Sequence, residues 1–176
     1  SDTHLKVMEI IRQETMPGTY INLGSRDWFP QLPLCTIINC DLHNWGIPSL
    51  IRCDLDCGQS WPFKDEVFDV ALASSILEHL ECHWHFFRES ARILKAGGTL
   101  IVDVPNILSS GDRQLFLKEG RFAWYGPDKV HRGHINLIPK WELDYIAGEV
   151  GFKVKRVDYN NVSEEVIIET MVKEAK

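Results

Sequence analysis

The chain of 176 residues is 44% hydrophobic, and 19 Lys and Arg against 25 Asp and Glu give it a net charge of -6. This length and composition predict one globular domain over residues 1–176 with a core of its own. The acidic balance and the lack of a Lys or Arg run argue against nucleic acid or an anionic membrane as a partner. No apolar run approaches the about 18 residues of a membrane span. Residues 1–16 are too polar for a secretory signal, so we expect a cytoplasmic protein with a small-molecule or protein partner.

The first part of the chain predicts one helix followed by three strands. Apolar residues at helical spacing predict an amphipathic helix over residues 4–14, which Met-Pro-Gly at residues 16–18 ends. Short β-branched or apolar runs bounded by turn residues predict the strands, at residues 19–23, 35–42 and 49–55. We expect these three strands to be neighbours in one sheet.

The middle of the chain predicts the centre of that sheet. Residues 68–75 are nearly all apolar, as expected of a strand covered on both faces, and are the candidate for the central strand. An apolar stripe from Ile76 to Leu94 predicts one continuous helix, and residues 99–105 predict a fifth strand. Strands that alternate with helices or loops indicate a parallel sheet with right-handed crossovers.

The last third combines an irregular segment with regular elements. Residues 106–138 are polar and aromatic without a clear period, and such a stretch is usually a functional lid or a partly helical insertion. A helix should follow, with Pro139 at its start and Gly151 at its end. Residues 153–160 and 164–172 predict an antiparallel hairpin, because the gap is too short for a crossover helix. The predicted fold class is α/β, a doubly wound, mostly parallel seven-stranded sheet with a C-terminal antiparallel hairpin.

The cysteines and histidines do not predict a metal site. Five cysteines at irregular spacings predict reduced thiols rather than disulfides. The segment HLECHWH holds four possible zinc ligands, namely His79, Cys82, His83 and His85. They lack the paired spacing of structural zinc sites and would all lie on the one predicted helix. We therefore predict that no metal is bound.

Glycine, carboxylate and hydroxyl groups follow the first four predicted strands, at the edge where an open α/β sheet binds its ligand. They are Gly24, Asp41, Asp54, Ser74 and Ser75. A carboxylate one strand after a glycine turn suits a ribose, because its two oxygens accept from both vicinal hydroxyls. The less favoured alternative is that Asp41 and Asp54 are plain strand-end turn residues, since Asp is common there.

Between about residues 19 and 106 the chain resembles a known family. The stretches that carry the resemblance are INLG, RCDLDCGQSWPFKDEVFDVALASSILEHL and RESARILKAGGTLIVDVPN. An acid before W-P-F, then F-D, E-H and L-K-x-G-G in that order, is similar to the pattern of the class I S-adenosylmethionine-dependent methyltransferases. The subgroup that it resembles is often associated with the biosynthesis of surface sugars.

The resemblance implies a Rossmann-like fold with S-adenosyl-L-methionine as the cofactor. In that family the residue at Gly24 lets the backbone approach the methionine part of the cofactor, and the acid at Asp41 takes the ribose hydroxyls. Asp54 and the amide of Leu55 would read the adenine edge, and the two serines after the fourth strand would lie under the sulfonium. The implied cofactor-binding residues are Gly24, Arg26, Asp41, Asp54, Leu55, Ser74 and Ser75.

Near the glycine turn the chain departs from the family pattern. Asn22 stands where the family usually has an acid, and Arg26 and Trp28 stand where it has small residues. Pro30 and Pro33 predict that the helix after this turn is short or absent, which removes amides and a dipole end that favour a carboxylate. Arg26 would either pair with the methionine carboxylate instead or fill the space.

Few residues are needed for the chemistry itself. Methyl transfer from a sulfonium has a neutral leaving group, so alignment of the acceptor and exclusion of water matter most. If a base takes part, the candidates are His131 and His134, which otherwise lie in a solvated loop. Glu78 and His79 would belong to the site or would cap and solvate the helix after the fourth strand.

Three functions follow, in order of preference. The first is methyl transfer from S-adenosyl-L-methionine to a small molecule or a glycan precursor. The second is a non-catalytic methyltransferase-like module, with impaired or lost cofactor binding, that binds a protein partner. A nicotinamide enzyme comes third, because G-x-G-x-x-G is absent.

Overall fold

The structure is a computed structural model that describes residues 2–14, 17–26, 28, 30–47, 50–56, 58–128, 133–160 and 164–175. Its elements are α1 (Asp2–Glu14), β1 (Thr19–Leu23), β2 (Thr36–Asp41), β3 (Leu50–Arg52), β4 (Phe68–Ser74), the 3-10 turn η1 (Leu77–His79), α2 (His83–Ile93), β5 (Leu94–Pro105), α3 (Ser110–Glu119), α4 (Lys140–Glu149), β6 (Phe152–Tyr159) and β7 (Val166–Lys173). Each strand predicted from the sequence overlaps one of these strands.

Seven strands form one sheet in the order β3-β2-β1-β4-β5-β7-β6. The neighbours from β3 to β5 pair in parallel, and β7 is antiparallel to both β5 and β6. The predicted mostly parallel sheet with a C-terminal hairpin is therefore confirmed, and β4 is the central strand. The chain changes its winding direction between β1 and β4, which places the topological switch point at the carboxyl ends of these two strands.

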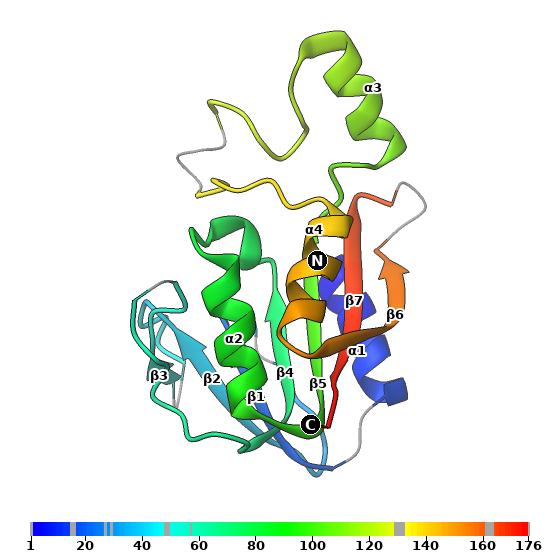
Figure 1. The fold of residues 1–176 in the computed structure, drawn as a ribbon. Helices are drawn as coiled ribbons and strands as arrows, with labels where there is room; N and C mark the ends of the chain where they lie inside the picture. Colours follow the sequence, from blue (N-terminus) through cyan, green and yellow to red (C-terminus); the bar gives the residue numbers. More distant parts are fainter. Residues whose placement is uncertain are drawn as a thin grey trace.

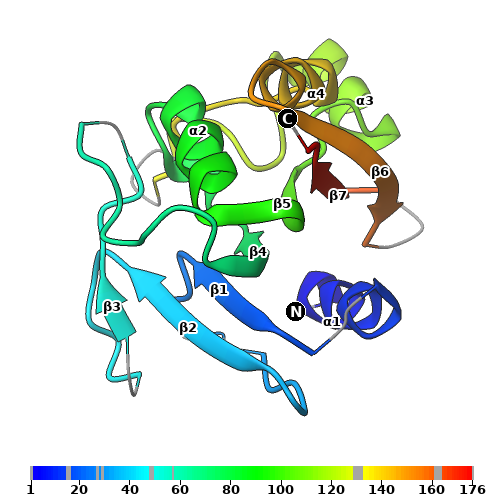
Figure 2. The ribbon, with the colours of Figure 1, turned by 60° about the horizontal axis from the view of Figure 1, so that its bottom comes forward.

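Helices cover both faces of the sheet, with α1 on one face and α2 and α4 on the other (Figure 2). Successive side chains of β4 point to opposite faces of the sheet, so this strand contributes to the core on each face. Val70 and Leu72 pack in the cluster that contains Ile10 of α1, whereas Ala71 and Ala73 belong to the cluster under α2 and α4. A strand buried from both sides is apolar along most of its length, as β4 is apart from Asp69 and Ser74.

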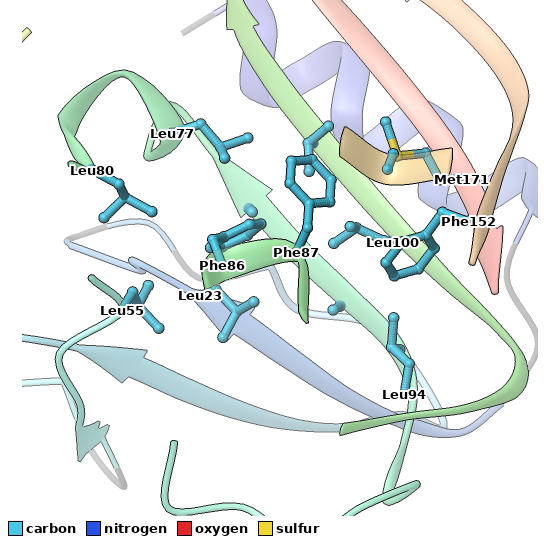
Figure 3. Packing of buried hydrophobic residues seen from close by; sticks show 14 of the residues in the cluster. Leu23, Leu55, Leu77, Leu80, Phe86, Phe87, Leu94, Leu100, Phe152 and Met171 are labelled. Atoms are coloured by element: carbon cyan, nitrogen blue, oxygen red, sulfur yellow. The ribbon is translucent and has the colours of Figure 1, made fainter. Parts of the chain in front are cut away.

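The larger core lies between the sheet and helices α2 and α4 (Figure 3). Phe86 and Phe87 of α2 are fully buried, and their rings meet edge to face with 5.5 Å between centroids. Phe87 also meets Phe152 at the start of β6. Burying a side chain of this size contributes about 1.5–3 kcal/mol. This packing fixes α2 over β4, and with it the chain between them.

The single helix predicted from Ile76 to Leu94 is wrong. The chain forms η1, breaks, and begins α2 afterwards, and Leu94 already belongs to β5. The carboxylate of Asp56 accepts the backbone N–H groups of Glu81 and Cys82 at distances of 2.8 to 3.0 Å. These amides lie at the start of α2, where a helix leaves its N–H groups without intrahelical partners. A carboxylate from a distant loop therefore sets where this helix begins.

The segment predicted as a lid or partly helical insertion, residues 106–138, contains α3, which lies beyond the carboxyl ends of the parallel strands (Figure 1). The hydroxyl of Ser109 accepts the N–H of Asp112 at the start of α3. The buried carboxylate of Asp112 in turn accepts the N–H of Ala123 at 2.6 Å. One aspartate thus joins α3 to the chain that follows it.

The predicted shortening after β1 is confirmed. The residues described between Gly24 and Cys35 contain no helix, so the turn after β1 has no helix N-terminus behind it. Pro30 and Pro33 lie in this irregular stretch, where their fixed φ and missing N–H are tolerated. Among the helices that the structure describes, none has the length and apolar character to cross a membrane.

Candidate active site

A cavity of about 950 Å³ opens at the carboxyl ends of the parallel strands. Its volume is near the upper end of the about 300–1,000 Å³ typical of small-molecule sites. All seven residues that the sequence predicts for cofactor binding lie on its walls, and so does His134. His131 lies outside the described residues. The structure therefore brings the predicted residues together around one space, while their individual roles stay predictions.

The glycine turn after β1 is fixed by close packing. The N–H groups of Gly24 and Ser25 both donate to the carbonyl of Cys40 in β2, at 2.8 and 3.1 Å. Gly24 has a φ of +69°, and a Cβ atom built there would lie 2.6 Å from Cδ1 of Ile76. Only glycine fits both the backbone angle and this approach. Ile76, which lines the cavity, thus favours glycine at position 24 whether or not a ligand is bound.

Asp41 ends β2 and holds two loops of the cavity. Its Oδ2 accepts the N–H of Arg26 at 2.8 Å, and its Oδ1 accepts the N–H of His43 at 2.9 Å. The strand-end turn that the sequence allows for this residue is therefore present. Each carboxylate oxygen has a further lone pair, so the same group remains able to accept ribose hydroxyls.

Asn22 and Arg26, two departures from the family pattern, hold defined positions. The buried amide of Asn22 donates to the carbonyl of Trp28 at 2.8 Å and to Oδ1 of Asn39 at 3.2 Å. It therefore ties the chain after the glycine turn back to β1 and β2. Arg26 has a φ of 44°, which is uncommon for a residue other than glycine. Its guanidinium lies over the ring of Trp45, 5.8 Å from the centroid, so this side chain reaches the loop after β2.

The loop after β3 supplies one apolar and two acidic residues. Leu55 is buried, whereas Asp54 is exposed. Oδ1 of Asp54 accepts the N–H of Asp56 at 3.0 Å and closes a turn. Behind this loop the N–H of Trp61 donates to the carboxylate of Glu89 in α2 at 2.6 Å. This bond anchors the loop to the core.

A buried carboxyl supports the end of β4. Oδ1 of Asp103 accepts both the N–H and the hydroxyl of Ser75, at 3.1 and 3.0 Å. Burial raises the pKa of Asp103 to about 6, although hydrogen bonds with Ser74 and Ser75 act in the opposite direction. Ser75 has a φ of 53°, so this contact holds a serine in a left-handed conformation beside the cavity.

Glu78, His79 and His134 meet on one wall of the cavity. One ligand atom from each of them lies within 4.8 Å of the other two. Burial, together with the nearby charge of Asp103, raises the pKa of Glu78 to about 8, although a hydrogen bond with the backbone of Glu78 acts in the opposite direction. Burial lowers the pKa of His79, although a hydrogen bond with the backbone of Gly133 opposes this.

Two alternatives from the sequence are thereby excluded. Glu78 is only 2% exposed, so it is not a solvated residue at a helix end. His134 is half-buried against the rings of His79, Trp124 and Tyr125 and does not lie in a solvated loop.

The four ligands that the sequence places on one helix do not form one group in the structure. His79 lies on η1, apart from α2, which removes the ground for predicting that no metal binds. Nε2 of His83 lies 2.9 Å from the carbonyl oxygen of Leu77, and the ring of His85 meets Trp61 edge to face. Within the described ranges, the one set of three potential ligands that comes together is Glu78, His79 and His134.

Aromatic side chains close the cavity from two sides. The rings of His4 in α1 and Trp28 stack with 4.4 Å between centroids. On the other side Trp124 of the insertion stacks with His134, 6.4 Å apart. All four line the cavity, as does Trp45. The sequence did not predict α1 as part of the site. The first turn of α1 carries no sequence motif, and α1 reaches the cavity only because of how it packs in the fold.

Three comparisons relate the chain to known proteins. The profile of the methyltransferase domain family matches residues 35–102. An uncharacterised protein of Methanocaldococcus jannaschii is 40% identical over 96 residues, which are 54% of this chain and 43% of that protein. Ajmaline N-methyltransferase of Rauvolfia serpentina is 29% identical over 93 residues, 47% of this chain and 32% of the plant enzyme. The chain therefore spans less than half the length of these curated relatives.

Solved structures agree on the fold. A methyltransferase of Thermotoga maritima, described as S-adenosylmethionine-dependent and as a possible histamine N-methyltransferase, superimposes with a TM-score of 0.68 at 17% identity. The superposition covers 98% of this chain and 89% of that protein. The strand order, the antiparallel β7 and the cavity at the switch point define a class I methyltransferase fold. Together with the profile match over residues 35–102, they make the chain similar to the class I S-adenosylmethionine-dependent methyltransferases. The cofactor of that family is S-adenosyl-L-methionine.

The residues of the cavity fit this cofactor. Ser25 Oγ and Glu78 Oε2 are buried on its wall without a hydrogen-bond partner in the described part of the chain, as expected of a space that takes a polar ligand. Among the described lining residues, Arg26 is the one Lys or Arg. The acidic lining residues are Asp2, Asp41, Asp54, Asp56, Glu78 and Glu165. This charge balance favours a cationic ligand such as a sulfonium.

Proposed function

We propose that this chain transfers a methyl group from S-adenosyl-L-methionine to a small molecule, glycan precursors included. The observation that carries the proposal is the cavity of about 950 Å³ between the carboxyl ends of β1 to β4 and the insertion. A space of this size has room for an acceptor beside the cofactor. The names of ajmaline N-methyltransferase and of the possible histamine N-methyltransferase, both small-molecule enzymes by name, support this choice.

The cofactor would lie along the strand ends, with its methionine part at the Gly24 turn and its ribose at Asp41. Asp54 and Leu55 would take the adenine, and the serines after β4 would face the sulfonium. When bound, the cofactor supplies an electrophilic methyl group: the acceptor's lone pair forms the new bond while the S–C electron pair returns to sulfur. The excess of carboxylates favours the charged cofactor over its neutral sulfide product, so it also favours product release.

The chain's own contribution is to align the acceptor and to exclude water. Two pairs of stacked rings, Trp124 with His134 and His4 with Trp28, line the space and shield it from water. Where the acceptor carries a proton, His134 lines the cavity and is the candidate to accept it. His131, the other candidate base, keeps that proposed role.

A non-catalytic binding module is the second candidate function. It is favoured by the Ile76 side chain packed against Gly24 and by the lack of a helix among the described residues that follow. Both features reduce the backbone contacts available to the methionine carboxylate. In this alternative the aromatic cavity binds a partner without methyl transfer.

Calorimetric titration with S-adenosyl-L-methionine and with its demethylated product separates the two functions. We expect both to bind at one site per chain, the charged cofactor more tightly. A methyl-label assay over small amines and sugar hydroxyls then identifies the acceptor. No heat with either compound would reject the methyltransferase and leave the binding module.

Arg26 variants distinguish the two roles of that side chain. If the guanidinium pairs with the methionine carboxylate, Arg26→Ala should weaken cofactor binding by about ten- to a hundredfold. Asp41→Ala should then weaken it further. If Arg26 fills the space, Arg26→Gly should strengthen binding instead. Arg88→Ala is the matched control, because Arg88 also lies over a tryptophan, Trp84, but does not line the cavity.

A further inference from the structure

Two imidazoles and one carboxylate meet on the cavity wall, and none of the contacts described for the cofactor uses them. One ligand atom from each of Glu78, His79 and His134 lies within 4.8 Å of the other two, and all three residues line the cavity. The residues come from η1 and from a segment 55 positions further along the chain. Their meeting is therefore a product of the fold and not of a local motif.

Main-chain contacts hold this arrangement. The carbonyl of Glu78 accepts the N–H groups of both Ile135 and Asn136, at 3.0 and 3.2 Å. The side chain of Asn136 also donates to the carbonyl of Leu80. His134 is thus fixed beside η1 by the residues that follow it, as a preorganised ligand set requires.

The residue before His134 adapts to the same contact. Gly133 has a φ of +84°, and a Cβ atom at this position would lie 2.9 Å from Nδ1 of His79. Glycine permits both the angle and the approach. The backbone at Gly133 therefore lies close to the His79 ring.

The carboxylate of Glu78 bonds to the backbone of Glu78, but one of its two oxygens has no hydrogen-bond partner among the described residues. Glu78 is 2% exposed, and its Oε2 has no hydrogen-bond partner in the part of the chain that the structure describes. A buried carboxylate is normally paired with a cation or bound to a metal. Arg26, whose charge acts on His79, reaches toward Trp45 and makes no ion pair with Glu78 among the described contacts.

We propose that Glu78, His79 and His134 bind one divalent transition-metal cation on the wall of the cavity. Two histidines and a glutamate form a ligand set that suits Zn²⁺, Fe²⁺ and related ions, whereas Ca²⁺ and Mg²⁺ prefer oxygen ligands alone. The three ligand atoms already lie within 4.8 Å of one another, and they would move closer together to reach the about 2.0–2.2 Å of zinc coordination.

The position of the site indicates that the cation would hold the methyl acceptor. Three protein ligands leave coordination positions open, which is the arrangement of catalytic rather than structural zinc. Those positions face the cavity, so an oxygen or nitrogen of the acceptor would be held and oriented there. This role rests on the proposed methyl transfer, whereas the binding of the cation does not. It also makes His134 a ligand rather than a base.

Titration of the chelator-treated protein with Zn²⁺ tests the site. We expect one Zn²⁺ per chain, with affinity reduced more than about a hundredfold in His134→Ala and in Glu78→Gln, because loss of a direct ligand exceeds the effect of an outer partner. His43→Ala is the matched control, since His43 lines the same cavity outside the ligand set. It should bind Zn²⁺ as the wild type does. Absence of binding, or equal binding by the ligand variants, would overturn the proposal.

Separate control experiments test the folding of each variant and the binding of the cofactor. Circular dichroism confirms that each variant is folded, and Glu78→Gln keeps the size of the side chain. The visible absorption of Co²⁺ in the wild type, lost in His79→Ala, gives a second readout of the same ligands. Cofactor titration in the presence of chelator completes the test. Cofactor binding without Zn²⁺ binding rejects the metal site alone, and Zn²⁺ binding without cofactor binding rejects the methyltransferase alone.

Discussion

At the scale of single residues, Gly24 shows how packing fixes a residue that a ligand would also require. Its φ of +69° is strained for any other residue, and a Cβ atom would overlap the side chain of Ile76 unless that side chain shifted. We expect Gly24→Ala to destabilise the fold by about 2–4 kcal/mol, from the left-handed angle and the overlap together. Urea unfolding measures this change in the free energy of unfolding.

The control for this substitution is Gly120→Ala. Gly120 has nearly the same φ, +68°, but has no atom within 4 Å of a built Cβ. It should cost only about 1–2 kcal/mol, the part due to the angle. Equal losses at the two positions would show that Ile76 does not make Gly24 necessary.

A second residue, Asp103, should give the fold a measurable pH dependence. Its pKa is raised from 3.8 to about 6, so the native state keeps a proton that the unfolded chain releases. Stability therefore falls as the pH rises from about 4 to about 6. Asp103→Asn keeps an acceptor for Ser75 and removes the titration, so unfolding free energies at pH 4.5 and pH 7 should differ less than in the wild type, by roughly 1–3 kcal/mol.

Burial of Glu78 adds a pH dependence of its own in the wild type and in Asp103→Asn alike, and comparison of the two proteins removes the part due to burial. The part that comes from the charge of Asp103 is lost in Asp103→Asn together with the titration of Asp103 itself. Asp103→Ala provides the opposite case, because it loses both bonds to Ser75 and should be destabilised at either pH. An Asp103→Asn protein with the wild-type pH dependence would mean that Asp103 does not titrate in this range.

At the scale of elements, one ion pair joins α4 to β7. Lys140 Nζ lies 2.9 Å from Oε1 of Glu169, whose side chain is fully buried in the sheet, and 2.8 Å from Asp144. Burial raises the pKa of Glu169 to about 7 even though Lys140 lowers it. Without Lys140 that pKa should rise further, and stability should keep falling above pH 7 instead of levelling off.

We expect Lys140→Met to lose about 1–3 kcal/mol of unfolding free energy at pH 8 and less at pH 6, since Lys140 is partly exposed. Urea unfolding at both pH values measures the difference. The double variant Lys140→Met/Glu169→Gln should recover most of the loss, because it leaves no buried charge. A double variant as unstable as Lys140→Met would assign the effect to packing.

The elements also show what the sequence could and could not predict. The apolar run of β4 is a local property, so its bounds were predicted to within one residue. The break before α2 depends on Asp56, a residue 25 positions before Glu81, and a helical stripe in the sequence cannot reveal it. The cofactor-site residues were predictable because the carboxyl ends of parallel strands meet at one edge. The meeting of Glu78 with His134 depends on how an aperiodic segment returns to η1, which no local pattern encodes.

At the scale of the whole molecule, the sheet should differ in stability from its centre to its edge. β4 is paired on both sides and buried on both faces, whereas β3 has three residues and, among the described strands, pairs with β2 alone. Asp112 is the one buried residue of α3. Native-state hydrogen exchange should therefore show β4 and β5 opening only with global unfolding, and β3 and α3 opening at lower free energy. Uniform protection across the sheet would contradict this gradient.

The place of β7 between β5 and β6 has a consequence for the order of assembly. During synthesis the chain of β6 leaves the ribosome before that of β7, yet β6 pairs with no other described strand than β7. The parallel part of the sheet, from β1 to β5, consists only of residues 19–105. All five of these strands are therefore synthesised before β6 and β7. Insertion of β7 is then the step that completes the sheet, because β7 pairs with the edge of β5 and with β6 at the same time. Until that step the long edge of β5 is unpaired, and it is the part of the nascent protein most exposed to misassociation.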